Sequence, residues 1–98
     1  MAQLIVRDSG KTYLIDLALG ERLVVGRSHT CDIPIVAGRA SRKHAAFLPV
    51  EGGHQISDLD STNGTLLNGA PFQHDTLLAN GDTVEVGSCT LLYRVVPR

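Results

Sequence analysis

Short apolar runs alternate with turn residues along the chain, at the intervals of roughly 8–12 residues that are typical of β-sandwiches and barrels. The pattern is clearest at 12–17, where Tyr13, Ile15 and Leu17 fall on one face of an extended strand. No window of helical length carries an apolar stripe with a 3.6-residue period and caps. Because each alternating strand must bury one face against a second layer, the pattern predicts an all-β fold, an antiparallel β-sandwich of about ten strands in two sheets.

Turn residues set most of the expected strand boundaries. Pro34 predicts that one strand lies at a sheet edge, because proline cannot donate a ladder hydrogen bond. The Asn-Gly-Asp sequence at 80–82 predicts a hairpin between 76–78 and 83–86, and another turn is expected at Leu19-Gly20-Glu21. The expected strands are 4–6, 12–17, 23–25, 33–35, 45–50, 54–59, 65–67, 76–78, 83–86 and 89–96.

The length and composition favour a single globular domain over residues 1–98. A chain of 98 residues with 43% hydrophobic and 19% charged residues can bury a core without staples. Cys31 and Cys89 are too few for a disulfide scaffold and are expected to be small buried thiols. Residues 1–6 lack signal-peptide features, and no apolar run approaches the roughly 20 residues of a membrane span. We therefore expect a cytoplasmic, monomeric domain that does not contact a membrane.

The same numbers exclude a general nucleic-acid binder. Aromatic residues make up 4% of the chain, with no Trp, so no stacking surface for single-stranded nucleic acid is expected. The net charge of −1 also argues against a polyanion-binding surface. The basic residues are nevertheless unevenly distributed: within 27–43 only Asp32 opposes four of the nine Lys and Arg residues, which are Arg27, Arg39, Arg42 and Lys43.

Two long segments without strand character, 27–32 and 36–43, interrupt the series of strands. Loops of this length in a compact β-domain are more often functional than idle. Together with 60–65 they carry three polar clusters: Gly26-Arg27-Ser28, Ser41-Arg42-Lys43-His44, and Asp60-Ser61-Thr62-Asn63-Gly64-Thr65 followed by Asn68-Gly69. Brought to one end of a sheet, these clusters would form a receptor for a phosphate group.

The residue types in these clusters suit a phosphothreonine, which carries nearly two negative charges and three acceptor oxygens. Arg27 can supply a forked guanidinium and Arg42 a second cation. Ser41 and Thr62 can each donate a hydroxyl, and Asn63 can offer its amide to a peptide backbone. Taken singly, each residue has a more ordinary explanation as a solvated or turn residue. Their order and separation together favour the phosphate receptor.

The clusters resemble the signature of the forkhead-associated (FHA) domain, and the resemblance covers essentially the whole chain. It implies a β-sandwich of about eleven strands whose apical loops bind phosphothreonine in a partner protein. The implied partner is a Thr-phosphorylated protein, either a Ser/Thr protein kinase or its substrate, and no cofactor is implied. The domain would be a signalling adaptor rather than an enzyme.

The resemblance also assigns roles to individual residues. The phosphate would be met by Arg27, Ser41, Arg42 and Thr62, and Asn63 would bond to the peptide main chain. Arg39 would read the side chain about three residues C-terminal to the phosphothreonine, with an acidic or polar preference. Arg42 is often a polar uncharged residue in this family, so the site is expected to be unusually basic. The structural positions of the motif would be Gly26, His44, Gly64 and Asn68, with His44 bracing the loop that presents Ser41.

The same residues allow three other interpretations. Ser41, His44 and Asp58 or Asp60 are residue types found in hydrolases, but the nucleophile elbow is missing and Ser41 and His44 share one short loop. The segment 29–32 (His-Thr-Cys-Asp) holds three possible metal ligands without a second ligand pair, so no metal site is expected. The main alternative is an FHA-like module that acts through phosphate-independent protein–protein or homodimer contacts.

Overall fold

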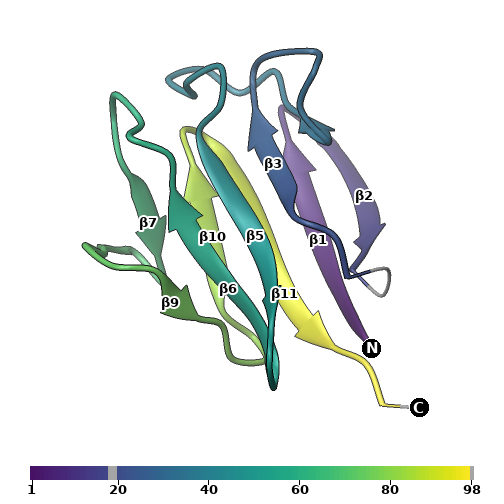
Figure 1. The fold of residues 1–98 in the computed structure, drawn as a ribbon. Helices are drawn as coiled ribbons and strands as arrows, with labels where there is room; N and C mark the ends of the chain where they lie inside the picture. Colours follow the sequence, from purple (N-terminus) through teal and green to yellow (C-terminus); the bar gives the residue numbers. More distant parts are fainter. Residues whose placement is uncertain (18–19, 98) are drawn as a thin grey trace.

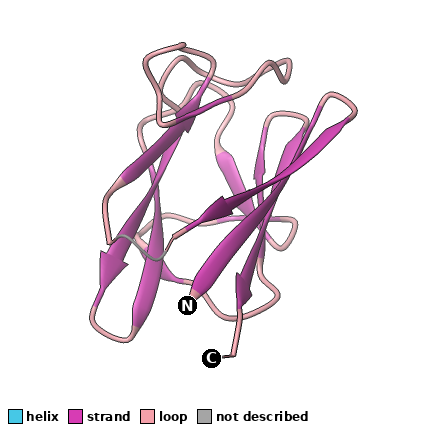
Figure 2. Cartoon of the chain, turned by 90° about the vertical axis from the view of Figure 1, so that its right-hand side faces the viewer, coloured by secondary structure: helices cyan, strands magenta, loops and turns pink. Residues whose placement is uncertain are grey.

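A computed structural model describes residues 1–17 and 20–97, which form eleven β-strands in two packed sheets (Figure 1). The side view shows the two layers, with long loops at the upper end and both termini at the lower end (Figure 2). The predicted all-β sandwich is therefore confirmed. In the described residues no helix has the length and apolar character needed to cross a membrane.

The strands divide between a six-stranded and a five-stranded sheet. The first has the order β2-β1-β11-β10-β7-β8 and contains β1 (Ala2–Asp8), β2 (Lys11–Asp16), β7 (Thr65–Leu67), β8 (Ala70–Pro71), β10 (Thr83–Val86) and β11 (Cys89–Val95). The second has the order β4-β3-β5-β6-β9 and contains β3 (Leu23–Gly26), β4 (Ile33–Pro34), β5 (Ala45–Val50), β6 (Gly53–Asp58) and β9 (Thr76–Leu77).

The core lies between the sheets and is built from aliphatic side chains and one buried phenylalanine. Leu4 and Val6 of β1 face Phe47 and Ile56 of the opposite sheet, and all four are fully buried. Each such side chain contributes about 1.5–3 kcal/mol when it leaves water. The alternation expected at 12–17 is also present, because Leu17 is buried and Tyr13 and Ile15 pack against the core.

Pro34 lies in β4 at the edge of its sheet, as predicted. The β3–β4 pair is parallel, however, whereas the other pairs among the described strands are antiparallel. The short strand β8 (Ala70–Pro71) was not expected, because two residues give no readable period.

The hairpin predicted at 80–82 is wrong. β9 pairs with β6 in one sheet, and β10 pairs with β11 and β7 in the other. The turn itself exists, but the Gly81 amide donates to the Tyr93 carbonyl (2.8 Å) and the Val95 amide to Asn80 Oδ1 (2.8 Å). These bonds direct the chain from one sheet to the other. Of the turn expected at 19–21, Leu19 lies outside the described residues.

The upper end of the sandwich collects the functional loops. Three connections meet there, β3–β4 (27–32), β4–β5 (35–44) and β6–β7 (59–64), and we call these the apical loops (Figure 1). Both segments expected from the sequence to be irregular, 27–32 and 36–43, lie within them.

Candidate phosphate-binding site

The six side chains proposed from the sequence as ligand contacts line one open depression of about 380 Å³ at the apical end. We call it the central depression. One lining residue comes from the β3–β4 loop, four come from the β4–β5 loop and two from the β6–β7 loop. Its lining is Arg27, Arg39, Ser41, Arg42, Thr62 and Asn63, together with Ala40. Residues up to 36 positions apart in the sequence, from 27 to 63, thus converge on one surface.

The β3–β4 and β4–β5 loops are joined through their backbones. The Arg27 amide donates to the Ser41 carbonyl and the Ser28 amide to the Arg42 carbonyl, both at 3.0 Å. Gly26 makes this approach possible, because a Cβ at this position would lie 2.1 Å from the Arg42 carbonyl oxygen. The pairing fixes Arg27 next to Ser41.

His44 connects the β4–β5 loop to the β6–β7 loop from below. Its side chain is fully buried. Its Nδ1 accepts the Ser41 backbone N–H (2.9 Å), and its Nε2 lies 2.8 Å from the Gly64 carbonyl oxygen. Because a backbone amide can only donate and a carbonyl can only accept, His44 is the neutral tautomer with its proton on Nε2. The ring holds Ser41 and the end of the β6–β7 loop at a fixed separation.

Two further hydrogen bonds cross between the same loops at the surface. Ser41 Oγ accepts the Thr62 backbone N–H at 3.0 Å, which leaves the Ser41 hydroxyl proton available to another acceptor. Asn63 Nδ2 donates to the Arg39 carbonyl at 3.0 Å. Arg39 has a left-handed backbone (φ 71°), and this bond helps hold it there. This bond uses one of the two Nδ2 hydrogens of Asn63. The other Nδ2 hydrogen and Oδ1 take no part in it.

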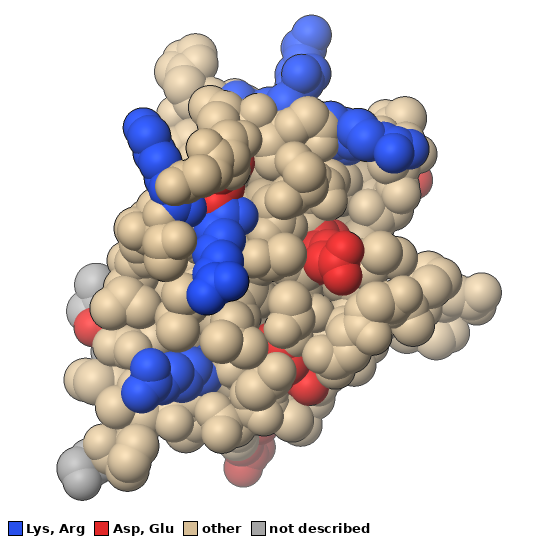
Figure 3. Space-filling model, turned by 180° about the vertical axis from the view of Figure 1, so that it is seen from behind, with Lys and Arg blue, Asp and Glu red and all other residues tan. Residues whose placement is uncertain are grey.

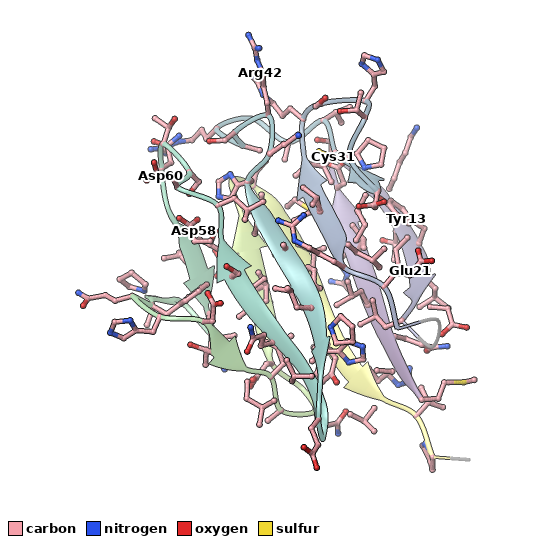
Figure 4. The ribbon with its side chains drawn as sticks, viewed as in Figure 1. Tyr13, Glu21, Cys31, Arg42, Asp58 and Asp60 are labelled. Carbon is pink, nitrogen blue, oxygen red and sulfur yellow. The ribbon has the colours of Figure 1, made fainter. Side chains whose placement is uncertain are left out.

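Asp58 anchors the β6–β7 loop at the end of β6, below Asp60 (Figure 4). Its Oδ1 accepts the hydroxyls of Ser61 and Thr65, both at 2.6 Å, and its Oδ2 accepts the Ser61 amide at 3.2 Å. Burial by itself raises the pKa of Asp58, but these three bonds outweigh it and the pKa is lowered. From the sequence, Asp58 is expected only as a candidate hydrolase residue. An Asp three positions before a Ser was the available signal for this turn.

The six-stranded sheet also supports the β4–β5 loop through contacts that are not predicted from the sequence. The Asp8 carboxylate, only 5% exposed, accepts the Val36 amide at 2.9 Å. Gly87 approaches the loop so closely that a Cβ would lie 2.3 Å from the Gly38 carbonyl oxygen. Both contacts join segments distant in the sequence, so no local pattern indicated them.

The positions expected to be structural lie outside the lining of the central depression. Gly64 has a φ of 80°, which favours glycine, and its carbonyl meets His44. Asn68 has a φ of 51° in the β7–β8 turn. Its Oδ1 accepts the Thr83 amide and its Nδ2 donates to Asp82, both at 2.9 Å. Asn68 therefore stabilises the turn rather than facing the depression.

The hydrolase and metal interpretations find no support in the geometry. His44 bonds through Nδ1 to the Ser41 amide and through Nε2 to Gly64, so neither nitrogen is placed to take the Ser41 hydroxyl proton. In the segment 29–32, Asp32 accepts the Val24 amide and the Cys31 thiol donates to the Arg42 carbonyl. Burial also raises the pKa of Cys31, which disfavours the thiolate. Within 1–17 and 20–97 no three His, Cys, Asp or Glu side chains gather as metal ligands.

The apical end is also where basic side chains are prominent. Seen from behind, blue side chains project from the upper end of the molecule (Figure 3). Arg42 extends away from the body of the sandwich (Figure 4), so its guanidinium is free to reach a ligand. Arg27, Arg39 and Arg42 are all exposed.

Comparison with known proteins gives consistent matches. The family model of the FHA domain matches residues 23–87. The ABC transporter ATP-binding/permease protein Rv1747 of Mycobacterium tuberculosis is 42% identical over 69 residues, covering 70% of this chain and 8% of that protein. The glycogen accumulation regulator GarA of Mycolicibacterium smegmatis is 33% identical over 91 residues, covering 93% of this chain and 55% of that protein. The chain thus spans about half of GarA and a small part of Rv1747.

A solved structure agrees over the whole fold. It comes from a structural and functional analysis of phosphothreonine-dependent FHA domain interactions, and it matches with a TM-score of 0.82 and 30% identity. The match covers 99% of this chain and 98% of that one.

Proposed function

This chain belongs to the FHA domain family, and we propose that it is a non-catalytic module that binds phosphothreonine-containing segments of partner proteins. The observation that carries the proposal is the convergence of two arginines and two hydroxyls on the central depression. Arg27, Arg42, Ser41 and Thr62 offer donors from three loops, which suits a group with three acceptor oxygens.

The loop contacts leave the required donors free. The Ser41 hydroxyl already accepts a bond from the Thr62 amide, so its own proton is available to a different acceptor. Charged hydrogen bonds contribute about 1.5–3 kcal/mol each, so three or four of them hold a phosphopeptide with roughly micromolar affinity after the cost of association. Asn63 retains one N–H and its Oδ1, the pair of groups that a peptide backbone needs.

The proposed partner is a protein phosphorylated on threonine by a Ser/Thr kinase, and the encounter takes place in the cytoplasm. Relatives include a glycogen accumulation regulator and an oxoglutarate dehydrogenase inhibitor of Corynebacterium diphtheriae, which are regulatory proteins by name. The domain would act by bringing such a partner to the protein that contains the domain. No step of this function requires a cofactor.

Calorimetry with one peptide in three forms tests the proposal. We expect the phosphothreonine form to bind, the unmodified form not to bind, and the form with Glu in place of phosphothreonine to bind poorly. A carboxylate has one charge and two planar oxygens where the site meets nearly two charges and three oxygens. Equal binding of the unmodified and phosphorylated forms would refute the proposal.

Substitutions in the central depression locate the binding site. Arg27→Ala and Ser41→Ala should each weaken binding at least about tenfold without unfolding the domain, because each removes a charged hydrogen bond. Arg94→Ala is the matched control, since Arg94 is exposed on β11 and outside the depression. Wild-type affinity in both test variants would overturn the assignment.

A second candidate function is binding of a partner through a sheet face, without phosphate. A competition experiment with a phosphopeptide distinguishes it from the first. If the physiological partner binds at the apical end, a short phosphothreonine peptide should displace it. Persistence of the complex under saturating phosphopeptide would favour the sheet face instead.

A further inference from the structure

The two sheets end in four edge strands, and one of these edges differs from the rest. β4, β8 and β9 have two residues each, and β4 and β8 contain Pro34 and Pro71. Short length and proline are devices that keep an edge from pairing with another chain. β2 has six residues and no proline, and it lies at the margin of the six-stranded sheet (Figure 1). Among the described strands, β2 is therefore the one edge long enough to accept a further strand.

The register of β2 decides which of its backbone groups face outwards. The Leu17 amide, directly after the strand, donates to the Ala2 carbonyl at 2.9 Å. Because hydrogen-bonded pairs recur at every second residue of an antiparallel ladder, the amides and carbonyls of Thr12 and Leu14 point away from β1. Both residues are exposed. In residues 1–17 and 20–97 no strand pairs with this side of β2.

An apolar row crosses the outer face of the sheet and ends at the same edge. Ile5 of β1 stands between Leu14 of β2 and Leu92 of β11. Its side chain faces outwards, because its neighbours Leu4 and Val6 point into the core and are fully buried. Leu14 ends the row with 59% of its surface exposed. A further strand with an apolar residue opposite Leu14 would extend the row and cover this side chain.

The charges of the edge indicate what that strand is. Lys11 begins β2, and Arg7 lies opposite Thr12 on β1, whereas Asp16 ends β2. An antiparallel strand of the same sequence places its acidic end beside the basic end of this one. A parallel strand of the same sequence would bring like charges together, which is unfavourable. The pattern is therefore complementary to itself in the antiparallel orientation.

We propose that β2 pairs edge to edge with β2 of a second copy of this chain, antiparallel and centred on Leu14. Each Leu14 then forms a hydrogen-bonded pair with Leu14 of the second copy, with Cα atoms about 5.5 Å apart. Thr12 lies opposite Asp16, and Tyr13, labelled on β2 in Figure 4, lies opposite Ile15. Tyr13 and Ile15 are half-buried in the single chain, so the pairing covers them further.

The pairing is closed at two copies and leaves the central depression open. Each chain offers one long edge within its described residues, so a two-fold pair uses both edges and does not continue into a fibre. No residue of β2 lines the central depression. Because β2 runs away from the apical loops, the antiparallel pair points its two central depressions in opposite directions (Figure 1). This dimer would replace the monomer expected from the sequence, and it does not depend on the ligand of the apical loops.

Sedimentation equilibrium of the 98-residue chain tests the inference. One pair of six-residue strands covers less than the roughly 1,600 Å² of a standard interface, so we expect a dissociation constant above about 1 μM. Between about 10 μM and 1 mM the average mass should rise from 10.5 kDa towards twice that value. A mass of 10.5 kDa throughout would overturn the inference.

Two substitutions at Leu14 address the edge itself. Leu14→Pro removes an outward N–H and spares the ladder with β1, and Leu14→Lys places two ammonium groups opposite each other. Each should weaken association at least about tenfold, with the folded state verified by thermal unfolding. Leu77→Lys is the matched control, because Leu77 is also 59% exposed but lies on the two-residue edge β9. A dimer that survives both Leu14 variants, or that Leu77→Lys disrupts equally, would contradict the pairing.

Amide hydrogen exchange distinguishes edge pairing from packing of two outer faces. In the wild type, the amides of Thr12 and Leu14 should exchange about fivefold more slowly at high than at low protein concentration, because each gains a hydrogen bond in the dimer. Packing of two faces would cover the side chains of Leu14 and Leu92 and leave these amides in solvent. A dimer in which the exchange of both amides is independent of concentration would therefore overturn the edge pairing.

Discussion

The two ends of the sandwich each use a histidine to join separate segments of the chain, and they use it differently. At the apical end, His44 is fully buried and both of its nitrogens bond to backbone groups of two loops. At the opposite end, His54 is half-buried, and its Nδ1 lies 3.0 Å from the hydroxyl of Tyr93 on the other sheet. The two rings meet edge to face, with centroids 5.6 Å apart.

The surroundings of the two histidines differ as well. His54 borders a depression whose lining is mainly apolar, with Met1, Leu17 and Val95 among its residues. Around His44 the loops are irregular, and the buried Asp8 carboxylate accepts the Val36 amide of the β4–β5 loop. In the described residues, every buried side-chain nitrogen and oxygen has a partner. The contrast teaches that irregular backbone is held at the apical end by buried polar groups, which leaves the exposed side chains free for a ligand.

The largest expected effect comes from adding one methyl group under the apical loops. Gly26→Ala places a Cβ 2.1 Å from the Arg42 carbonyl oxygen, and neither backbone can move without breaking the pairing at Arg27. We expect the free energy of unfolding to fall by about 4 kcal/mol or more, with loss of peptide binding. Urea unfolding measures this. Gly38→Ala in the β4–β5 loop is the control, because its Cβ meets nothing within 4 Å. A tolerated Gly26→Ala would contradict the packing argument.

The second prediction compares the two histidines directly. His44→Ala leaves the Ser41 amide and the Gly64 carbonyl without their partners, so it should lower stability by about 2–4 kcal/mol. Phosphopeptide affinity should fall together with the melting temperature, because Ser41 loses its support. His54→Ala should lower stability by about 1 kcal/mol and leave affinity unchanged. If His54→Ala weakened phosphopeptide binding as much as His44→Ala, the lower end of the sandwich would contribute to the binding site, and the two ends would not be independent.

Much of this architecture was predictable from local patterns. Alternation at 12–17 and the edge position of Pro34 follow from properties of the strands themselves, and both are present. The three polar clusters also indicated which loops form the candidate site, because hydroxyl, amide and guanidinium groups together suit a phosphate ligand. The structure brings all six proposed contacts into one depression.

What the sequence did not predict depends on contacts between distant segments. The turn at 80–82 fixes its own backbone, but a turn does not determine which sheet the next strand joins. Asp8 and Gly87 lie far from the β4–β5 loop in sequence, and their support of it appears only in three dimensions. Polar residues at strand ends are usually interpreted as solvated, so a buried carboxylate such as Asp8 is easily missed.

The third prediction concerns Asp58 and acid pH. The folded state lowers the pKa of Asp58, so the stability it contributes is complete above its ordinary value of 3.8 and is lost as pH falls through the lowered value. Asp58→Asn turns an N–H group towards the Ser61 amide and should cost about 1–2 kcal/mol at neutral pH. Urea unfolding between pH 2 and 7, with pH values chosen in steps of about 0.5 around the ordinary pKa, should show a shallower acid decline for this variant. Parallel curves for the two proteins would contradict the assignment.

The smallest expected effect lies at the opposite end, between pH 8 and pH 5. Burial is the main cause that lowers the pKa of His54 below its ordinary value of 6.5. The unfolded chain therefore takes up a proton first as pH falls, so stability is complete above about 6.5 and declines until the pH passes the lowered pKa. Since the ring is half-exposed, solvent screening should keep this decline below about 1 kcal/mol.

His54→Gln removes this titration and retains a polar side chain near Tyr93. The difference between the wild type and the variant isolates His54, because the other titrating groups are common to both proteins. We expect the two unfolding free energies to converge as pH falls from 8 to 5, whereas phosphopeptide affinity at each pH stays the same in both. An affinity difference that grows towards pH 5 would show that His54 communicates with the apical loops. The buried core would then transmit a change at His54 to the loops that His44 holds, and the two ends of the sandwich would not be independent.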